Sequence, residues 1–137
     1  MNRLRGQISG IESNGHVSLV DVAVGGDTFS AILLEVPQSA PYLKVGNSVQ
    51  VLFKETEVSL AKNLSGQISL RNRITATVKQ IRHGEILSEV ILDYRGLAIV
   101  SVITSRSVRR LELKEGDTVE ALVKANEVSL MESEHEL

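Results

Sequence analysis

Residues 52–60, Leu-Phe-Lys-Glu-Thr-Glu-Val-Ser-Leu, return 70 positions later as residues 122–130, Leu-Val-Lys-Ala-Asn-Glu-Val-Ser-Leu. The same offset, without a gap, aligns residues 2–60 with residues 72–130 at sixteen identical positions. An internal repeat of this kind indicates two copies of one small structural unit. The sequence therefore predicts two tandem modules, the first over residues 1–61 and the second over residues 62–137, which begins with a polar linker at residues 62–67.

Both copies show the alternation of apolar and polar residues that is typical of β-strands. Five strands are predicted in the first copy around residues 4–8, 20–24, 29–33, 49–53 and 58–60, and the second copy repeats them around 74–78, 90–94, 99–103, 119–123 and 128–131. Between its third and fourth strands the second copy favours a short helix over residues 104–111, whereas two prolines limit the first copy to a turn or a very short helix from Pro37. These elements predict an all-β fold of two tandem OB-like five-stranded barrels, although a small sandwich would show the same periodicity.

Composition restricts the function classes. The chain has 137 residues and no cysteine, so the packing of two small modules and self-association must supply stability, which predicts a homo-oligomer. A net charge of −2 and few aromatic residues argue against a nucleic-acid partner. No apolar stretch is long enough to span a membrane, and residues 1–6 lack the apolar core of a signal peptide. We expect a cytoplasmic protein without a nucleic-acid or membrane partner.

The sequence contains no recognisable enzyme constellation. There is no cysteine nucleophile and no glycine-rich phosphate loop, and the histidines are not spaced as metal ligands. We therefore expect a protein that is not an enzyme and has no metal site of its own.

Three segments of the second copy place polar donors at predicted strand ends, namely residues 69–72, 104–107 and 124–126. The hydroxyls of Thr104 and Ser107, the unpaired N–H groups of a helix start, and the charge of Arg71 or Lys124 together describe an anion site. Serine and threonine also occur at helix starts simply as caps, so the spacing alone leaves both interpretations open.

These segments resemble the landmarks of the molbindin, or Mop, family within the TOBE group. The matching stretches are Gln67-Ile68-Ser69-Leu70-Arg71-Asn72, Ile103-Thr104-Ser105-Arg106-Ser107-Val108, Leu113-Lys114-Glu115-Gly116 and Val123-Lys124-Ala125-Asn126-Glu127-Val128. The resemblance covers the whole second copy and, more weakly, the first. It implies OB-like barrels that bind molybdate or tungstate in the cytoplasm at interfaces between barrels, without an organic cofactor. It also implies that tandem members assemble as trimers.

The resemblance implies a set of ligand-binding positions in the second copy. They are Ser69, Leu70, Arg71, Thr104, Ser107, Lys124 and Ala125, with the main-chain N–H groups of Leu70 and Ala125 among the donors. Leu70 stands where the family has alanine, and Asn126 stands where it has serine.

The first copy departs further from the family pattern. Leu34-Glu35 replaces Thr104-Ser105, and Lys54-Glu55-Thr56 replaces Lys124-Ala125-Asn126. Because carboxylates beside a dianion would repel it, we expect no repeat of the site in this copy. Lys54 is either a surface lysine or a further ligand in a site completed by another barrel.

The favoured function is therefore non-enzymatic binding and storage of molybdate or tungstate. The alternative is an oxyanion-sensing module that regulates through a separate transcription or transporter partner, because TOBE-type domains also occur in such proteins. Arg106, Arg109 and Arg110 cannot all point one way on a short helix, and they are interpreted as part of a solvated face.

Overall fold

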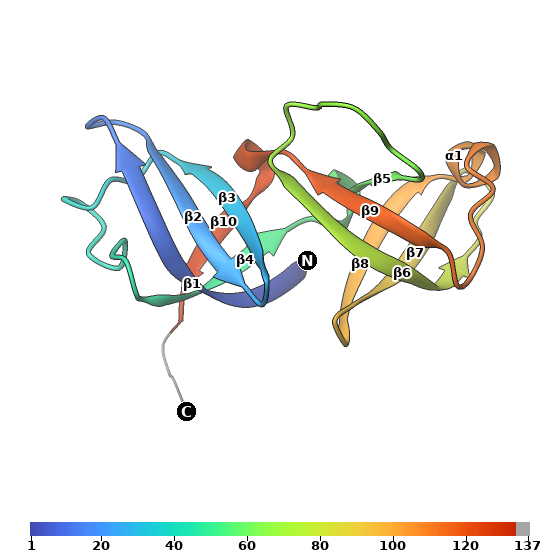
Figure 1. Ribbon diagram of the computed structural model, residues 1–137, viewed down its shortest axis with the longest axis horizontal. Coiled ribbons are helices and arrows are strands. Elements are labelled where there is room, and N and C mark those ends of the chain that lie inside the picture. The colour runs from blue at the N-terminus through green and yellow to red at the C-terminus, as the bar shows by residue number, and fades with distance from the viewer. Residues whose placement is uncertain (134–137) are drawn as a thin grey trace. The chain divides into compact units, whose positions relative to one another are not determined.

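The computed structural model of the chain describes residues 1–133, and the end of the second predicted module, residues 134–137, lies outside them. The described residues form ten strands, one short α-helix and two 3-10 turns (Figure 1). In chain order these are β1 (Asn2–Ser13), β2 (Ser18–Val24), β3 (Asp27–Leu33), β4 (Ser48–Phe53), η1 (Glu55–Glu57), β5 (Ser59–Ala61), β6 (Asn72–Arg82), β7 (Leu87–Tyr94), β8 (Leu97–Thr104), α1 (Ser105–Arg110), β9 (Thr118–Val123), η2 (Ala125–Glu127) and β10 (Ser129–Glu132). Every predicted strand and the predicted helix are present.

The two copies share their irregular features as well as their strands. Each long first strand carries a β-bulge at the equivalent place, after Ile8 in β1 and after Val78 in β6. In each copy the glycine of the Leu-Lys-x-Gly turn has positive φ and donates its N–H to the carbonyl oxygen of the residue before the bulge, Gly46 to Ile8 and Gly116 to Val78, both at 2.8 Å. Positive φ favours glycine, which explains why this residue recurs in the repeat. The repeat therefore preserves the bend of the sheet as well as its apolar pattern.

The first compact unit comprises Met1–Phe53 together with the described residues from Lys124 onward. Its antiparallel sheet has the strand order β10-β4-β1-β2-β3. Alternate side chains of β2 are buried, as the sequence pattern predicts, and the rings of Phe29 and Phe53 stack with their centroids 6.0 Å apart. The apolar face of this sheet is therefore its core.

The second compact unit comprises Lys54–Val123, with the antiparallel strand order β5-β9-β6-β7-β8. Val90, Leu92 and Tyr94 of β7 alternate into its core. The buried hydroxyl of Ser101 in β8 donates to the carbonyl oxygen of Val58 at 2.8 Å. This bond fastens the end of η1 to β8, so the segment that follows β4 is held firmly in the second unit.

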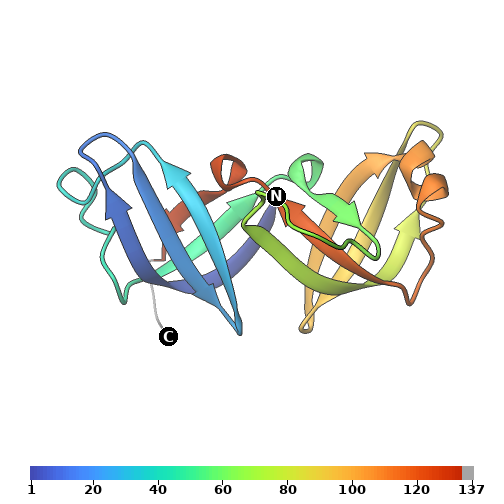
Figure 2. The ribbon, with the colours of Figure 1, turned by 45° about the horizontal axis from the view of Figure 1, so that its top comes forward.

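Each sheet is completed by a strand from the other repeat, so the compact units do not coincide with residues 1–61 and 62–137. In Figure 2 the red β10 lies along β4 and the green β5 lies along β9. The two pairings have equivalent registers, with Ser129 opposite Leu52 and Ser59 opposite Leu122. Because residues 58–60 and 128–130 have the same sequence, the same side chains fill the same places in both sheets.

Candidate functional site

The two hydroxyls predicted at the start of the helix lie together in the structure. Thr104 is the N-cap of α1, and its Oγ1 accepts the N–H of Ser107 at 3.0 Å. The same Oγ1 donates to the Oγ of Ser107 at 2.9 Å, so the hydroxyl proton of Ser107 must point elsewhere. Thr104 is exposed and Ser107 is half-buried. The pair is therefore both a helix cap and a hydroxyl donor at the surface of its unit.

Ser105 has a structural part in this arrangement. Its N–H donates to the carbonyl oxygen of Ile86 at 2.8 Å, and its Oγ donates to that of Gly84 at 2.7 Å. The Oγ of Ser105 also lies 2.7 Å from the Oγ of Ser88, and both serines are buried. These bonds anchor the start of α1 on the β6–β7 connection. They also occupy the N–H of Ser105, so the helix start offers fewer free donors than the sequence indicates.

The first motif, Ser69-Leu70-Arg71, precedes β6 as an irregular segment. Ser69 and Arg71 are exposed and Leu70 is half-buried. Asn72, the next residue, is buried and begins the strand opposite Val123 of β9. The buried asparagine therefore fixes the point at which the polar motif leaves the sheet.

The third motif, Lys124-Ala125, directly follows β9. Lys124 is exposed with an extended backbone, and its carbonyl oxygen accepts the N–H of Glu127 at 2.9 Å in the turn η2. This turn packs against β3. Lys124 and Ala125 thus belong to the first compact unit, whereas Ser69, Leu70, Arg71, Thr104 and Ser107 belong to the second.

Within the second unit, the first motif and the Thr104 hydroxyl lie at opposite ends of the sheet. β6 is 11 residues long, from Asn72 to Arg82, and Arg82 pairs with Glu89 of β7. Leu87, beyond that pair, is opposite Thr104. At roughly 3.3 Å per residue, the two ends of β6 are on the order of 30 Å apart. The unit therefore does not bring Arg71 to Thr104.

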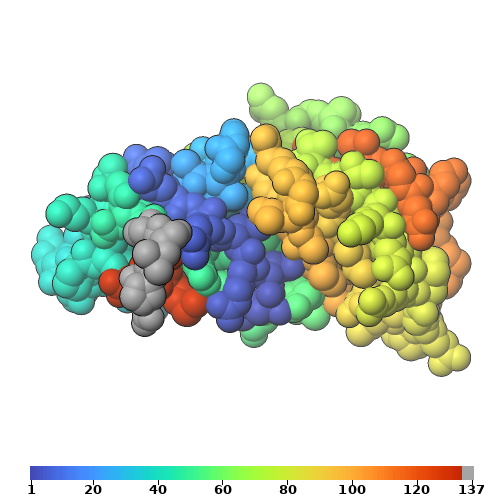
Figure 3. Space-filling view, turned by 90° about the horizontal axis from the view of Figure 1, so that it is seen from below, coloured from blue at the N-terminus to red at the C-terminus, as the bar shows by residue number. Residues whose placement is uncertain are grey.

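A pocket of about 240 Å³ opens beside Thr104. It is lined by Thr104, Arg106 and Arg109 together with Glu85 and Ile86 of the β6–β7 connection, which projects from its unit in yellow in Figure 3. Arg106, Arg109 and Arg110 are all exposed, as the sequence interpretation of a solvated face predicts, and the first two also line this pocket. The spacing of the three arginines was the available signal, because residues three and four apart share one side of a helix, and the expectation that they could not all point one way was therefore wrong.

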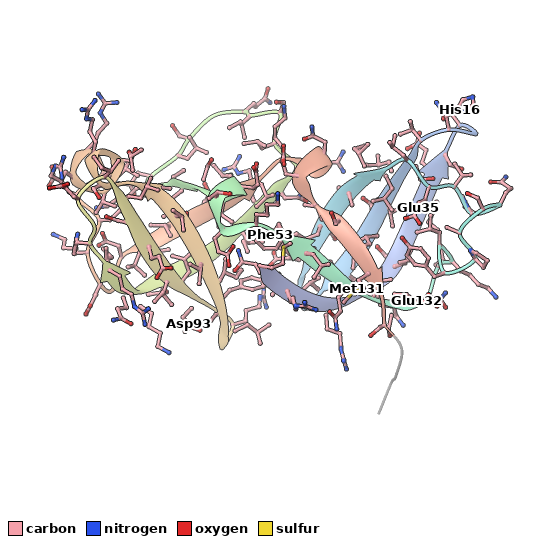
Figure 4. All side chains as sticks on the ribbon, turned by 180° about the vertical axis from the view of Figure 1, so that it is seen from behind. His16, Glu35, Phe53, Asp93, Met131 and Glu132 are labelled. Atoms are coloured by element: carbon pink, nitrogen blue, oxygen red, sulfur yellow. The ribbon has the colours of Figure 1, made fainter. Side chains whose placement is uncertain are left out.

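The equivalent positions of the first copy are arranged differently. Leu34, which corresponds to Thr104, is 85% exposed. Glu35, labelled in Figure 4, accepts a hydrogen bond from the Tyr42 hydroxyl at 2.6 Å. Burial, and then this bond and the charge of Glu35, raise the pKa of Tyr42. The first copy therefore has a tyrosine–carboxylate pair near the place where the second copy has two hydroxyls.

Lys54, the further candidate of the first copy, opens the second compact unit. It is exposed, and it precedes η1, which packs against β8. Its side chain makes no capping bond to the turn. The structure thus assigns Lys54 to the unit that contains Arg71 and Thr104, and not to the unit that contains Lys124.

Lys62 fastens the linker to the turn between α1 and β9. Its Nζ donates to the carbonyl oxygens of Leu111 and Glu112, both at 3.0 Å, and lies 3.1 Å from the carboxylate of Asp117. The N–H of Lys114, followed by Lys62, holds the pKa of Asp117 below its usual value. The linker that leads to Ser69 is therefore bonded, at its first residue, to the residues that follow the C-terminal end of α1.

Among residues 1–133, no group of three or more histidine, cysteine or acidic side chains could hold a metal ion. The same residues include no helix that is long and apolar enough to cross a membrane.

The chain is similar in sequence and in structure to several known proteins. A family model for the TOBE domain matches residues 68–130. The molybdenum import ATP-binding protein ModC of Brucella abortus (strain 2308) is 36% identical over 108 residues, which make up 78% of this chain. The chain spans only 28% of the length of ModC.

Two further relatives match most of their own length. Molybdenum-pterin-binding protein 1 of Clostridium pasteurianum is 35% identical over 65 residues, which cover 47% of this chain and 96% of that protein. A crystal structure of the cytoplasmic molybdate-binding protein ModG, with molybdate bound, is 34% identical and covers 96% of both chains with a TM-score of 0.90. The whole chain, and not one copy alone, therefore has a counterpart of known structure.

Proposed function

Because the chain belongs to the molbindin family of TOBE-domain proteins, as a tandem member, we propose that it binds molybdate or tungstate in the cytoplasm and stores it unchanged. The similarity to molybdate-bound ModG over 96% of both chains carries this proposal. The exposed hydroxyl, amide and cationic groups of the second copy suit the task, because a tetrahedral dianion needs several fixed donors and a compensating charge.

The oxyanion ligands are Ser69, Leu70, Arg71, Thr104, Ser107, Lys124 and Ala125, with Lys54 as a further contributor. Arg71 and Thr104 lie on the order of 30 Å apart in one unit, since β6 separates them by 11 residues. A site that uses both groups must therefore take them from different copies of the chain. We assign the protein to a homo-oligomer, a trimer by analogy with the family, in which the sites lie between barrels.

Each sheet is proposed to close into an OB-like barrel. In the first unit the two outer strands of the sheet, β10 and β3, lie in contact, and in the second unit β5 and β8 do the same. Contact between the outer strands of a five-stranded sheet is what closure requires. Closure also protects the edges, which otherwise invite pairing with other chains.

A regulatory role is the alternative. The similarity to ModC covers only 28% of that protein, so the shared part is a segment of a larger import protein. An oxyanion-sensing module that acts through a separate transcription or transporter partner would have the same ligand site. A stoichiometric DNA-binding or ATPase partner, recovered with the protein only when molybdate is present, would favour this role over storage.

Isothermal titration with molybdate, tungstate, sulfate and phosphate tests the proposal. We expect heat with molybdate or tungstate at micromolar protein, and light scattering should give the mass of a trimer. A protein that binds neither anion would overturn the proposed function. A monomer that binds with full affinity would instead overturn the intermolecular site.

A further inference from the structure

The pocket beside Thr104 contains more positive charge than the family motifs require. Arg106 and Arg109 come from one side of α1, and Glu85 and Ile86 come from the β6–β7 connection opposite. The N–H of Ser105 bonds to the carbonyl oxygen of Ile86 at 2.8 Å, so these two walls are fastened to each other. The pocket is therefore built by the fold of the second unit.

Neither guanidinium group is neutralised by a carboxylate within the described residues 1–133. Arg106 and Arg109 are exposed, and no carboxylate among residues 1–133 forms an ion pair with either of them. Glu85 lines the same pocket without such a pair. Two positive charges and one negative charge thus face the space beside the Thr104 hydroxyl, which leaves it with one excess positive charge.

The duplication provides an internal comparison. The residues of the first copy that correspond to Thr104, Arg106 and Arg109 are Leu34, Val36 and Ser39. The counterparts of Glu85 and Ile86 are Gly15 and His16. None of the positions equivalent to the two arginines is charged in the first copy. The charged pocket is therefore a property of the second copy alone, and the common fold does not require it.

We infer that Arg106 and Arg109 make the Thr104 site select doubly charged oxyanions over singly charged oxyanions of the same shape. The inference rests on the proposed function, and it adds two specificity-determining residues that are not among the ligand positions implied by the family resemblance. Thr104 and Ser107 recognise oxygen atoms, which every tetrahedral oxyanion presents. Only groups that respond to total ligand charge can separate a dianion from a monoanion of equal size.

Coulomb's law gives the size of the effect. The attraction between a guanidinium group and an anion is proportional to the anion's charge, so removing an arginine costs a dianion twice what it costs a monoanion. For two guanidinium groups each taken at about 7 Å from the anion in water, the dianion preference should fall about twofold at 0.15 M salt and about fivefold at about 0.01 M. The dependence on salt follows because a Debye length of about 8 Å at 0.15 M grows to about 30 Å at 0.01 M.

Tungstate and perrhenate are suitable probes, because both are tetrahedral tetroxo anions of similar size with charges of −2 and −1. Perrhenate affinity is measured by displacement of tungstate, in the full chain at low and high salt. The test variant is R106Q/R109Q. The matched control is K79Q/R110Q, which removes the same charge from the exposed Lys79 and from the helix residue next to Arg109, neither of which lines the pocket.

The tungstate-to-perrhenate affinity ratio of R106Q/R109Q should fall by the factors calculated above for low and high salt. The ratio of the control variant should change by less than half as much. Glu85→Gln should raise the preference. General damage to the pocket would weaken both anions equally and would leave the tungstate-to-perrhenate affinity ratio unchanged. An unchanged ratio in R106Q/R109Q would therefore overturn the inference. If perrhenate does not displace tungstate at all, tungstate affinity at low salt decides, and equal losses in the test and control variants would overturn it.

The proposed function fails in a different way. Wild-type protein that binds neither molybdate nor tungstate would remove the site itself. If wild-type protein binds tungstate and R106Q/R109Q keeps the full dianion preference, the proposed ligand site stands. Only the role assigned to the two arginines is then refuted.

Discussion

Thr104 and Ser107 are linked twice, since the Thr104 Oγ1 accepts the Ser107 N–H at 3.0 Å and donates to the Ser107 Oγ at 2.9 Å. One side chain thus caps α1 and also orients the neighbouring hydroxyl. The two functions can be separated, because the cap uses the main chain of Ser107 and ligand binding would use its side chain.

Thr104→Ala should lose both functions. Loss of an N-cap costs about 1 kcal/mol of stability, and loss of a hydroxyl that contacts a dianion should weaken molybdate binding about tenfold or more. Ser107→Ala should weaken binding to a similar degree while urea unfolding shows a change within about 0.5 kcal/mol. Thr104→Ser is the control that keeps both. Equal binding by Ser107→Ala and wild-type protein would show that this hydroxyl does not contact the anion.

Lys124→Ala should weaken molybdate binding about tenfold or more, because it removes a charge-assisted bond. Its stability should stay within about 0.5 kcal/mol of wild type, since Lys124 is exposed and its side chain makes no capping bond. Lys54→Ala, at the equivalent position of the first copy, is the matched variant for titration calorimetry. If Lys54→Ala abolished binding and Lys124→Ala did not, the assignment of the site to the second-copy motifs would be wrong.

Tyr42 should lose its proton only far above the ordinary tyrosine value of about 10, since burial and Glu35 raise its pKa. A raised pKa means that the folded state favours the protonated form. The corresponding stability is complete below about pH 10 and is lost as pH rises above it. Titration by ultraviolet absorbance, taken as the difference between wild type and Tyr42→Phe, should show Tyr42 ionising well above pH 10.

Glu35→Gln should move the Tyr42 component of that titration to lower pH without removing it. A Tyr42 component that ionises near pH 10 in the wild-type protein would contradict the Tyr42–Glu35 contact.

Lys62→Met should release the linker from the α1–β9 turn. Loss of its bonds to the carbonyl oxygens of Leu111 and Glu112 should lower stability by about 1 kcal/mol in chemical unfolding. Hydrogen exchange should then be faster in residues 62–71. Lys44→Met, at an exposed lysine that forms no ion pair in the described chain, is the control.

The partner of Lys62 adds a dependence on pH. The pKa of Asp117 is lowered, so its contribution to stability is present above about pH 4 and is lost as pH falls further. The stability difference between wild type and Lys62→Met should therefore shrink below about pH 4. A difference that stayed constant down to pH 3 would show that the ion pair contributes nothing.

Local sequence signals predicted most of the fold. Alternation located every strand. The sequence left Thr104 and Ser105 as alternative caps of the predicted helix, and in the structure the cap is Thr104. The exchange of β5 and β10 could not be predicted, because Val58-Ser59-Leu60 and Val128-Ser129-Leu130 are identical and either would fit either sheet. Which sheet β5 and β10 each join depends on the direction that the chain takes after η1 and η2, and this direction is set by tertiary packing.

The candidate site was predictable in its parts but not in its geometry. The motifs identified residues such as Arg71 and Thr104, yet only the strand registers show that they lie at opposite ends of one sheet. Arg106 and Arg109 are exposed, as the solvated-face interpretation predicts, but the sequence does not reveal that the β6–β7 connection stands opposite them and forms a pocket.

The strand exchange also limits how this protein can evolve. Each repeat supplies the closing strand of the other, so a substitution in residues 128–130 acts on the sheet built from the first repeat. Loss of either repeat would leave β4 or β9 with an open edge, which invites aggregation. The ligand positions can therefore diverge between the copies, as Leu34 and Thr104 have done, while the duplication itself is difficult to reverse.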